Sequence, residues 1–225
     1  MGSRLLNELR ARASWVLSLI GPGGSGKTHA ALWILENWFP EDEVAIFHYS
    51  KEALAALPDH LRERTFSFTS WEQLLGRCCI VLLDDTALFF LSRSTSKTEN
   101  KDLVSNSTIA RQNDLRFIST AQNTILVDKG MYEALDQFQL RSRMTECQAV
   151  TEREEAVQLQ LMINDLLEDA AEGKPTGYAI GLRFCPETGE TFHFPAIPWM
   201  TEQISKPYKG YYVQGGELRR KMMHS

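Results

Sequence analysis

The sequence has few cysteines, and none stands in a metal-binding or redox spacing. Its four cysteines lie at positions 78, 79, 147 and 185, without a Cys-x-x-Cys pair, and its five histidines show no ligand spacing. Disulfide scaffolds and zinc sites depend on such pairs. The pattern is therefore against both, and a reducing compartment is expected.

Long hydrophobic runs and an excess of positive charge are also missing. The longest apolar runs, Trp15–Ile20 and Cys78–Leu83, are far shorter than the roughly 20 residues that span a bilayer. Lys and Arg number 24 against 29 Asp and Glu, a net charge of −5. We expect a soluble, cytoplasmic protein with no membrane span of its own, and any nucleic acid must meet a local basic patch.

What the sequence does contain is an alternation of short apolar runs with helical periodicity, in a chain of 225 residues that is 43% apolar. This alternation predicts an α/β fold with a mostly parallel sheet, helices on both sides, and ligands at the carboxyl ends of the strands. The predicted strands are Ser14–Gly21, Val44–Tyr49, Thr65–Thr69, Cys78–Leu83, Leu115–Ala121 and Phe138–Met144. The predicted helices include Lys27–Trp38, Lys51–Leu57, Leu103–Asn113, Lys129–Gln137 and Thr151–Glu172, followed by a hairpin of Gly177–Phe184 with Thr191–Phe194.

A glycine-rich motif joins the first predicted strand to the first long helix. Glycines let backbone N–H groups curl around phosphate oxygens, and the helix that follows directs its positive end at them. Lys27 would reach the β- and γ-phosphates of ATP, and the Thr28 hydroxyl would ligate Mg²⁺. The predicted nucleotide-binding residues are Gly21, Pro22, Gly23, Gly24, Ser25, Gly26, Lys27, Thr28 and His29.

Two acids end the most apolar strand. Asp84, at the carboxyl end of a strand neighbouring the phosphate loop, is predicted to hold Mg²⁺ directly or through water. Asp85 is placed to orient and deprotonate the attacking water. Alternatively, both acids cap a helix over 86–91.

A further strand delivers an amide to the same edge of the sheet. Gln122 follows the run Phe117–Ala121 and could hydrogen-bond the γ-phosphate or the attacking water. The alternative is an amide that only satisfies the backbone of a loop.

With these three elements in order, the chain resembles the additional-strand P-loop ATPases, and within them the FtsK–HerA group of DNA-pumping motors. The stretch from Ala110 to Gln122 is similar to that group's Arg-bearing helix end, strand and terminal Gln. The acid pair and the small size look closest to genome-packaging ATPases of poxvirus-like and membrane-containing icosahedral viruses. The resemblance covers about residues 14–145.

This resemblance implies a RecA-like core that assembles as a homo-oligomeric ring, with ATP at the subunit interfaces. An Arg from the neighbouring subunit would stabilise charge on the γ-phosphate. Arg111 is the first candidate, followed by Arg141 and Arg143, although each could instead be a surface ion-pair partner.

Two segments could contact DNA. The polar stretch Ser92–Asp102 follows the acid pair, and the tail after Ile204 mixes basic residues with three tyrosines. The positively charged side chains of Lys and Arg neutralise phosphates, and aromatic rings stack on unpaired nucleotides. A tail that only adds solubility fits the composition equally well.

The sequence thus predicts an ATP- and Mg²⁺-dependent DNA translocase that packages a viral genome, in host cytoplasm or associated with the virion, with a capsid or membrane portal as a further partner. Its expected parts are an ATPase core (1–145), a helix and hairpin packed on it (146–203) and a basic aromatic tail (204–225). A filamentous-phage-type morphogenesis ATPase, an AAA-type helicase loader and a small-molecule kinase are the alternatives.

Overall fold

The computed structural model describes residues 3–86, 114–124, 137–152, 154–170, 178–182, 191–209, 211–214 and 217–220. Its main sheet consists of β1 (Trp15–Ile20), β2 (Val44–Phe47), β3 (Thr65–Phe68), β4 (Ile80–Leu83), β5 (Arg116–Ala121), β6 (Gln137–Ser142), β7 (Tyr178–Leu182) and β8 (Thr191–Phe192). The strand order is β3-β2-β4-β5-β1-β6-β7-β8. A separate two-stranded sheet pairs β9 (Tyr211–Gln214) with β10 (Glu217–Arg220).

The first six strands in this order, from β3 to β6, are parallel, as the sequence predicts. The predicted hairpin is present as β7 and β8, and it continues the main sheet because β7 pairs antiparallel with β6. The α/β fold with a mostly parallel central sheet is therefore confirmed.

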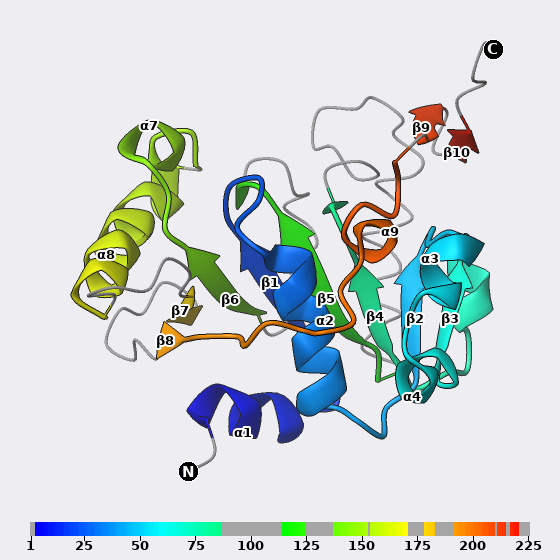
Figure 1. Cartoon of the computed structure of the whole chain (residues 1–225). Helices are drawn as coiled ribbons and strands as arrows, with labels where there is room; N and C mark the ends of the chain where they lie inside the picture. Colours follow the sequence, from blue (N-terminus) through cyan, green and yellow to red (C-terminus); the bar gives the residue numbers. More distant parts are fainter. Residues whose placement is uncertain are drawn as a thin grey trace, which may run out of the picture.

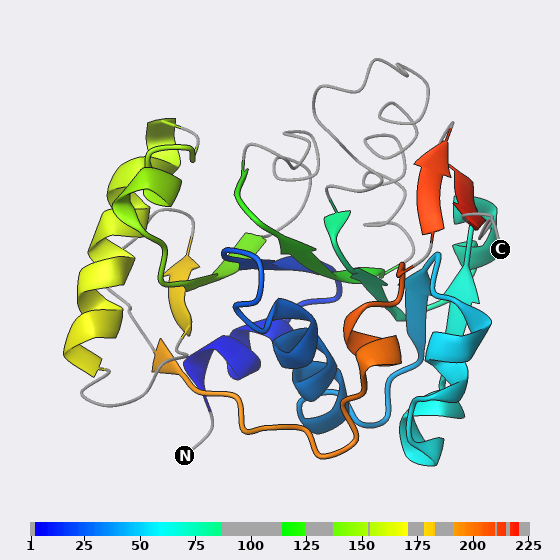
Figure 2. The ribbon, with the colours of Figure 1, turned by 45° about the horizontal axis from the view of Figure 1, so that its top comes forward.

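Within the described residues, the helices are α1 (Arg4–Arg10), α2 (Lys27–Asn37), α3 (Lys51–Ala55), α4 (Asp59–Arg62), α7 (Glu146–Ala149), α8 (Glu154–Ala170) and α9 (Glu202–Ser205), with a 3₁₀ turn, η1 (Trp71–Leu74). The sequence interpretation did not anticipate α1, whose Leu5 and Leu9 are buried. Figures 1 and 2 show α1, α2 and the segment before α9 on one side of the sheet, and α8 at the end formed by β6 and β7. No helix within the described part of the chain is long and apolar enough to cross a membrane.

Alternation along the strands divides the core into two layers. In β1, Trp15, Leu17 and Leu19 join the cluster under α1 and α2, whereas Val16 joins the cluster on the opposite face. Strand residues that are two apart point to the same face, so a strand covered on both sides must be apolar throughout. This is why β1 is apolar except for Ser18, whose hydroxyl is paired with that of Ser119 at 2.9 Å.

The predicted helix Leu103–Asn113 and most of the predicted helix Lys129–Gln137 lie outside the described residues, as does the stretch Ser92–Asp102. The first residues of the expected tail differ from the sequence interpretation. Ile204, which belongs to α9, is fully buried in the core where α9 meets α3, and it is followed by a buried Pro207. These residues pack on the core because the chain after β8 runs back across α2 and reaches α3, near β2, on the same face of the sheet (Figure 2). The three-part division of the chain stays a prediction.

Candidate functional site

The glycine-rich loop joins β1 to α2, which is the context that a phosphate-binding loop requires. Gly26 directly precedes α2 and has a φ of 84°, in the left-handed region where a side chain is strained. The Lys27 ammonium donates to the carbonyls of Gly21 and Pro22, at 2.8 and 2.9 Å. The lysine charge is therefore held on the loop itself.

Gly21 is required by a close approach of β6. A Cβ atom at this position would lie 1.8 Å from Ser142 Oγ and 2.9 Å from Ser25 Oγ. Ser142 ends β6, and its hydroxyl donates to the Ile20 carbonyl at 3.4 Å. The first glycine of the motif thus allows the loop to pack against the neighbouring strand.

Asp84 follows β4 and meets the phosphate-loop threonine. Its carboxylate is buried, and Oδ1 accepts hydrogen bonds from the hydroxyls of Thr28 at 3.0 Å and Thr120 at 2.8 Å. Oδ2 lies 3.2 Å from the same Thr28 hydroxyl. The structure therefore brings together the two residues that the sequence assigns to Mg²⁺, and both present oxygen, the ligand that this ion prefers.

Asp85 adopts an unusual backbone conformation beside this contact. Its φ is 49°, in the left-handed region, which aspartate tolerates better than most residues. Its backbone N–H donates to Thr120 Oγ1 at 2.7 Å. Backbone strain of this kind is concentrated at functional sites.

Burial dominates the electrostatics of these three charged groups. It raises the pKa of Asp84, although hydrogen bonds from Thr120 and Thr28 act in the opposite direction. It also raises the pKa of Asp85, against the attraction of Lys27, and it lowers the pKa of Lys27, against the attraction of both acids. Two carboxylates thus share one lysine in a desolvated site, and a divalent cation would supply the missing positive charge.

Strand β5 lies between β4, which Asp84 follows, and β1, which leads into the phosphate loop. Leu83 pairs with Ser119, and Ile20 pairs with Ala121. The inserted strand therefore ends between the acid pair and the phosphate loop, where Thr120 can bond to Asp84.

Gln122 directly follows β5 at this edge. The N–H of Gly21 donates to the carbonyl of Ala121 at 3.1 Å, which places the backbone before Gln122 against the start of the phosphate loop. The Gln122 side chain is exposed. Its position at the same edge agrees with the prediction, while its contact with a phosphate or water stays a prediction.

Arg141 does not fit the role of an arginine that reaches a neighbouring subunit. Its side chain is fully buried, lies 3.4 Å from Glu152 and donates to Gln160 at 2.9 Å. Glu152 in turn accepts the N–H of Thr124, two residues after Gln122, at 3.1 Å. Arg141 instead holds the end of β5 against β6 and the residues before α8.

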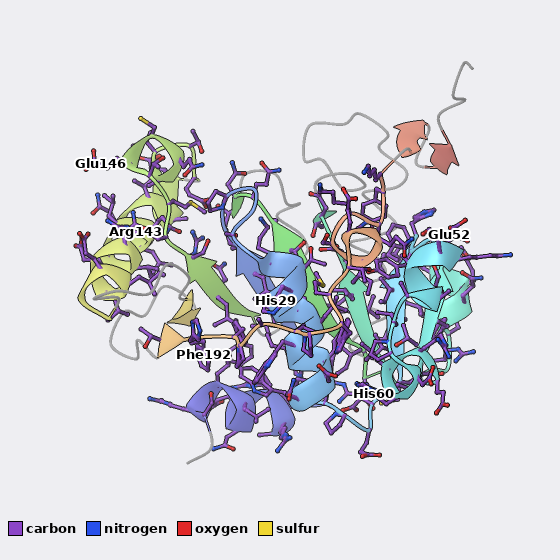
Figure 3. All side chains as sticks on the ribbon, viewed as in Figure 1. His29, Glu52, His60, Arg143, Glu146 and Phe192 are labelled. Carbon is purple, nitrogen blue, oxygen red and sulfur yellow. The ribbon has the colours of Figure 1, made fainter. Side chains whose placement is uncertain are left out.

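Of the other two candidate arginines, the structure describes only Arg143. Arg143 is exposed, pairs with Glu168 at 2.8 Å and lies beside α7 and α8 (Figure 3). Arg111 lies outside the described residues, so its predicted role is not tested.

His29 contacts the C-terminal segment. Its Nε2 accepts the backbone N–H of Ile197 at 3.0 Å, and Figure 3 shows the histidine on α2 where this segment crosses the helix. Burial lowers the pKa of His29, although a hydrogen bond with the Pro195 backbone acts in the opposite direction. Its assignment to nucleotide binding stays a prediction.

The sequence interpretation missed two residues that contact the acid pair. Thr120 was treated only as part of a strand, although a polar pair, Ser119 and Thr120, in an apolar run is a signal that could have been followed. Tyr208 was assigned to a tail, but its hydroxyl lies 3.3 Å from the carbonyls of both Phe47 and Asp84. No local pattern indicated that contact.

The basic residues of the expected DNA-binding tail are partly paired. Lys206 and Lys209 both contact Glu202, at 3.1 and 2.9 Å, and all three side chains are exposed. Exposed pairs of this kind contribute little to stability, so they leave both lysines able to exchange partners. The tail's contact with DNA stays a prediction.

The sequence matches no protein-family model and no curated protein. Solved structures of the genome packaging NTPase B204 from Sulfolobus turreted icosahedral virus 2 are similar. The complex with ATP-gammaS has a TM-score of 0.50 and 12% identity, over 83% of this chain and 100% of that chain. The complex with AMPPCP has a TM-score of 0.51 and 11% identity, over 81% and 98%. This likeness establishes a shared α/β fold.

Proposed function

We propose that the chain is an ATP-hydrolysing DNA translocase, the motor subunit that packages a viral genome. The observation that carries the ATPase part is the contact between Thr28 and Asp84, 3.0 Å apart at the foot of a glycine-rich loop. Phosphate-loop proteins hold Mg²⁺ between these two residue types while backbone amides hold the phosphates.

Mg²⁺ fits the groups that are present. It is bound through one or two carboxylates, with substrate phosphates and waters completing its shell. Thr28 and Asp84 would hold it, and the buried acid pair, with one lysine, leaves a charge for it to balance. When bound, the ion would neutralise charge on the phosphates.

The remaining residues of the site would position the reaction. Lys27 would exchange its bonds to the loop carbonyls for phosphate oxygens. Asp85, held by Thr120, would accept a proton from the attacking water, and Gln122 would orient that water or the γ-phosphate. Arg111 from a neighbouring subunit would stabilise the developing charge.

Coupling to DNA and assembly as a ring are supported by the sequence resemblance to DNA-pumping motors. The fold likeness to B204, described as a genome packaging NTPase, agrees with this assignment. On this proposal the chain acts on double-stranded DNA at a capsid or membrane portal, in host cytoplasm or in the virion, through the stretch 92–102 or the tail.

The test is ATP hydrolysis measured with and without duplex DNA. We expect DNA to stimulate hydrolysis, and Lys27→Ala to abolish it, because the variant lacks the charge that meets the phosphates. Lys51→Ala is the matched control, since Lys51 is an exposed lysine at the start of α3. Hydrolysis that is indifferent to every nucleic acid tested would contradict the motor assignment while leaving the ATPase.

Assembly is tested separately by particle mass in solution. We expect a non-hydrolysable nucleotide to favour a ring, because ATP would then lie at subunit interfaces. A particle that stays monomeric with both nucleotide and DNA would contradict the ring.

A further inference from the structure

The peptide that joins the two acids is held from both sides. Its N–H belongs to Asp85 and donates to Thr120 Oγ1 at 2.7 Å. Its carbonyl belongs to Asp84 and lies 3.3 Å from the hydroxyl of Tyr208. The C=O and N–H groups of a planar trans peptide point in opposite directions, so these two partners approach the peptide from opposite sides.

Tyr208 reaches this peptide from a distant part of the chain. It lies 124 residues after Asp84, between α9 and β9 (Figure 1). Before it, Ile204 belongs to the core cluster under α1 and α2, and its carbonyl accepts the hydroxyl of Tyr49 at 3.0 Å. Tyr208 itself packs against the cluster on the other face. The segment therefore passes over the carboxyl edge of the sheet, where β2 and β4 end.

The hydroxyl of Tyr208 is one donor placed between two strand ends. It lies 3.3 Å from the carbonyl of Phe47, the last residue of β2, and the same distance from the carbonyl of Asp84, which follows β4. Burial raises the pKa of this hydroxyl well above its ordinary value, and the charges of Asp84, Tyr49 and Asp85 act in the same direction. The hydroxyl therefore keeps its proton at neutral pH and remains a donor.

The backbone of Asp85 needs such support. Its φ is 49°, and a residue other than glycine keeps this conformation only where its surroundings over-determine it. On the β5 side the turn is also held by Thr86, whose hydroxyl donates to the Thr120 carbonyl at 2.7 Å. Tyr208 holds the opposite side. The direction in which the Asp85 side chain leaves the backbone follows from the orientation of this peptide.

We propose that Tyr208 is a positioning residue for hydrolysis: by fixing the peptide between Asp84 and Asp85, it holds the Asp85 carboxylate in line with the attacking water. The inference rests on the proposed function, because it takes Asp85 as the group that accepts the proton. A general base must lie within hydrogen-bond reach of the proton it removes, so a small rotation of this peptide is enough to slow the reaction.

The test removes one tyrosine hydroxyl at a time. Tyr208→Phe retains the ring and removes the donor to the Asp84 carbonyl. Tyr49→Phe is the matched control, because it removes a hydroxyl that anchors the same C-terminal segment at Ile204 without contacting the acid-pair peptide. Each variant loses a hydrogen bond to the backbone, so urea unfolding should show similar losses of stability.

Two measurements separate positioning from stability. In the chain without nucleotide, we expect hydrogen exchange of the Asp85 amide, followed by NMR, to be about 2- to 10-fold faster in Tyr208→Phe, because the peptide loses the partner of its carbonyl. With ATP, we expect kcat to fall by about tenfold at unchanged KM, a part of the roughly 10²–10⁴-fold that a general base contributes. Tyr49→Phe should change neither the Asp85 exchange nor kcat.

The outcomes separate this inference from the proposed function. If Tyr208→Phe leaves either the Asp85 exchange or kcat unaltered, the hydroxyl does not position Asp85 and the inference is overturned. Equal losses of kcat in the two variants would also overturn it, since the segment would then act through stability alone. Both results leave the unaltered chain as an ATPase, whereas an unaltered chain that does not hydrolyse ATP would contradict the proposed function itself.

Discussion

The hydroxyl of Thr120 donates to Asp84 Oδ1 over 2.8 Å and accepts the backbone N–H of Asp85 over 2.7 Å. One side chain of β5 thereby fixes both acids that follow β4. The bond is made in a buried site, where the carboxylate of Asp84 has little access to water. Thr120 therefore helps to keep this carboxylate ionised.

Replacing Thr120 with valine keeps the shape of the side chain and removes both hydrogen bonds. We expect Thr120→Val to lower the free energy of unfolding by roughly 1.5–3 kcal/mol, the contribution of a hydrogen bond to a charged group. Loss of such an outer partner typically weakens metal binding by about 10- to 100-fold, which Mg²⁺ titration of the ATPase rate would measure. Thr120→Ser, which retains the hydroxyl, should stay close to the unaltered chain, and a valine variant with normal Mg²⁺ dependence would contradict this role.

An alanine substitution at Gly21, the first glycine of the loop, should destabilise the chain far more than one at Gly23, the second. Gly21→Ala places a methyl group 1.8 Å from Ser142 Oγ, whereas nothing lies within 4 Å of a Cβ at Gly23. In thermal unfolding without nucleotide, we expect Gly21→Ala to lower the midpoint and Gly23→Ala to leave it nearly unchanged. Adding Ser142→Ala should restore part of the loss, because the nearest atoms are then Ser25 Oγ at 2.9 Å and the residue-142 Cβ at 3.0 Å. Equal effects of the two alanine substitutions would show that the close approach of β6 is unimportant.

Arg141 and Arg143, at the end of β6, should differ in how much each contributes to the free energy of unfolding. Arg141→Ala leaves Glu152 buried without its cation and should cost about 3–5 kcal/mol in urea unfolding. Arg143→Ala breaks an exposed pair and should cost roughly 0–1 kcal/mol. Arg141→Ala could instead be as stable as the unaltered chain and lose only ATP hydrolysis. If assemblies that mix this variant with unaltered subunits regained that hydrolysis, Arg141 would act between subunits after all.

The adjacent cysteines should differ in reactivity. Cys79 is buried, and burial raises the pKa of its thiol to about 12, whereas Cys78 and Cys147 are exposed. At pH 8 a maleimide should label Cys78 and Cys147 in the folded chain and reach Cys79 only after unfolding, as peptide mass spectrometry would show. Labelling of Cys79 at the rate of Cys78 would contradict its burial.

The raised pKa of the Cys79 thiol also makes the free energy of unfolding depend on pH. Above about pH 9 the unfolded chain loses the Cys79 proton while the folded chain keeps it, so the unfolded state binds fewer protons. This residue's contribution should therefore reduce the free energy of unfolding as the pH rises from about 9 toward 12. Urea unfolding of Cys79→Ala should show a weaker decline over this range than the unaltered chain, and identical slopes would contradict the shift.

The parts of the site that could be predicted are those specified by neighbouring residues. The loop from Gly21 to Thr28 carries its own conformational requirements, and the apolar run before Asp84 shows that a buried strand ends in an acid. Their meeting was predictable because the carboxyl ends of parallel strands share one edge. Arg141 was misread because a local sequence does not show whether a charge is exposed or paired within the core.

The sequence by itself determined the alternating elements, the phosphate loop and the edge of the sheet at which the polar residues gather, since these follow from local periodicity and glycine content. Tertiary structure alone decided that β5 lies between β4 and β1, that Ser142 closes on Gly21, and that Tyr208 returns to the carbonyl of Asp84. Such contacts join residues dozens of positions apart. They depend on strand order and on the path of the chain across α2, which no short stretch of sequence encodes.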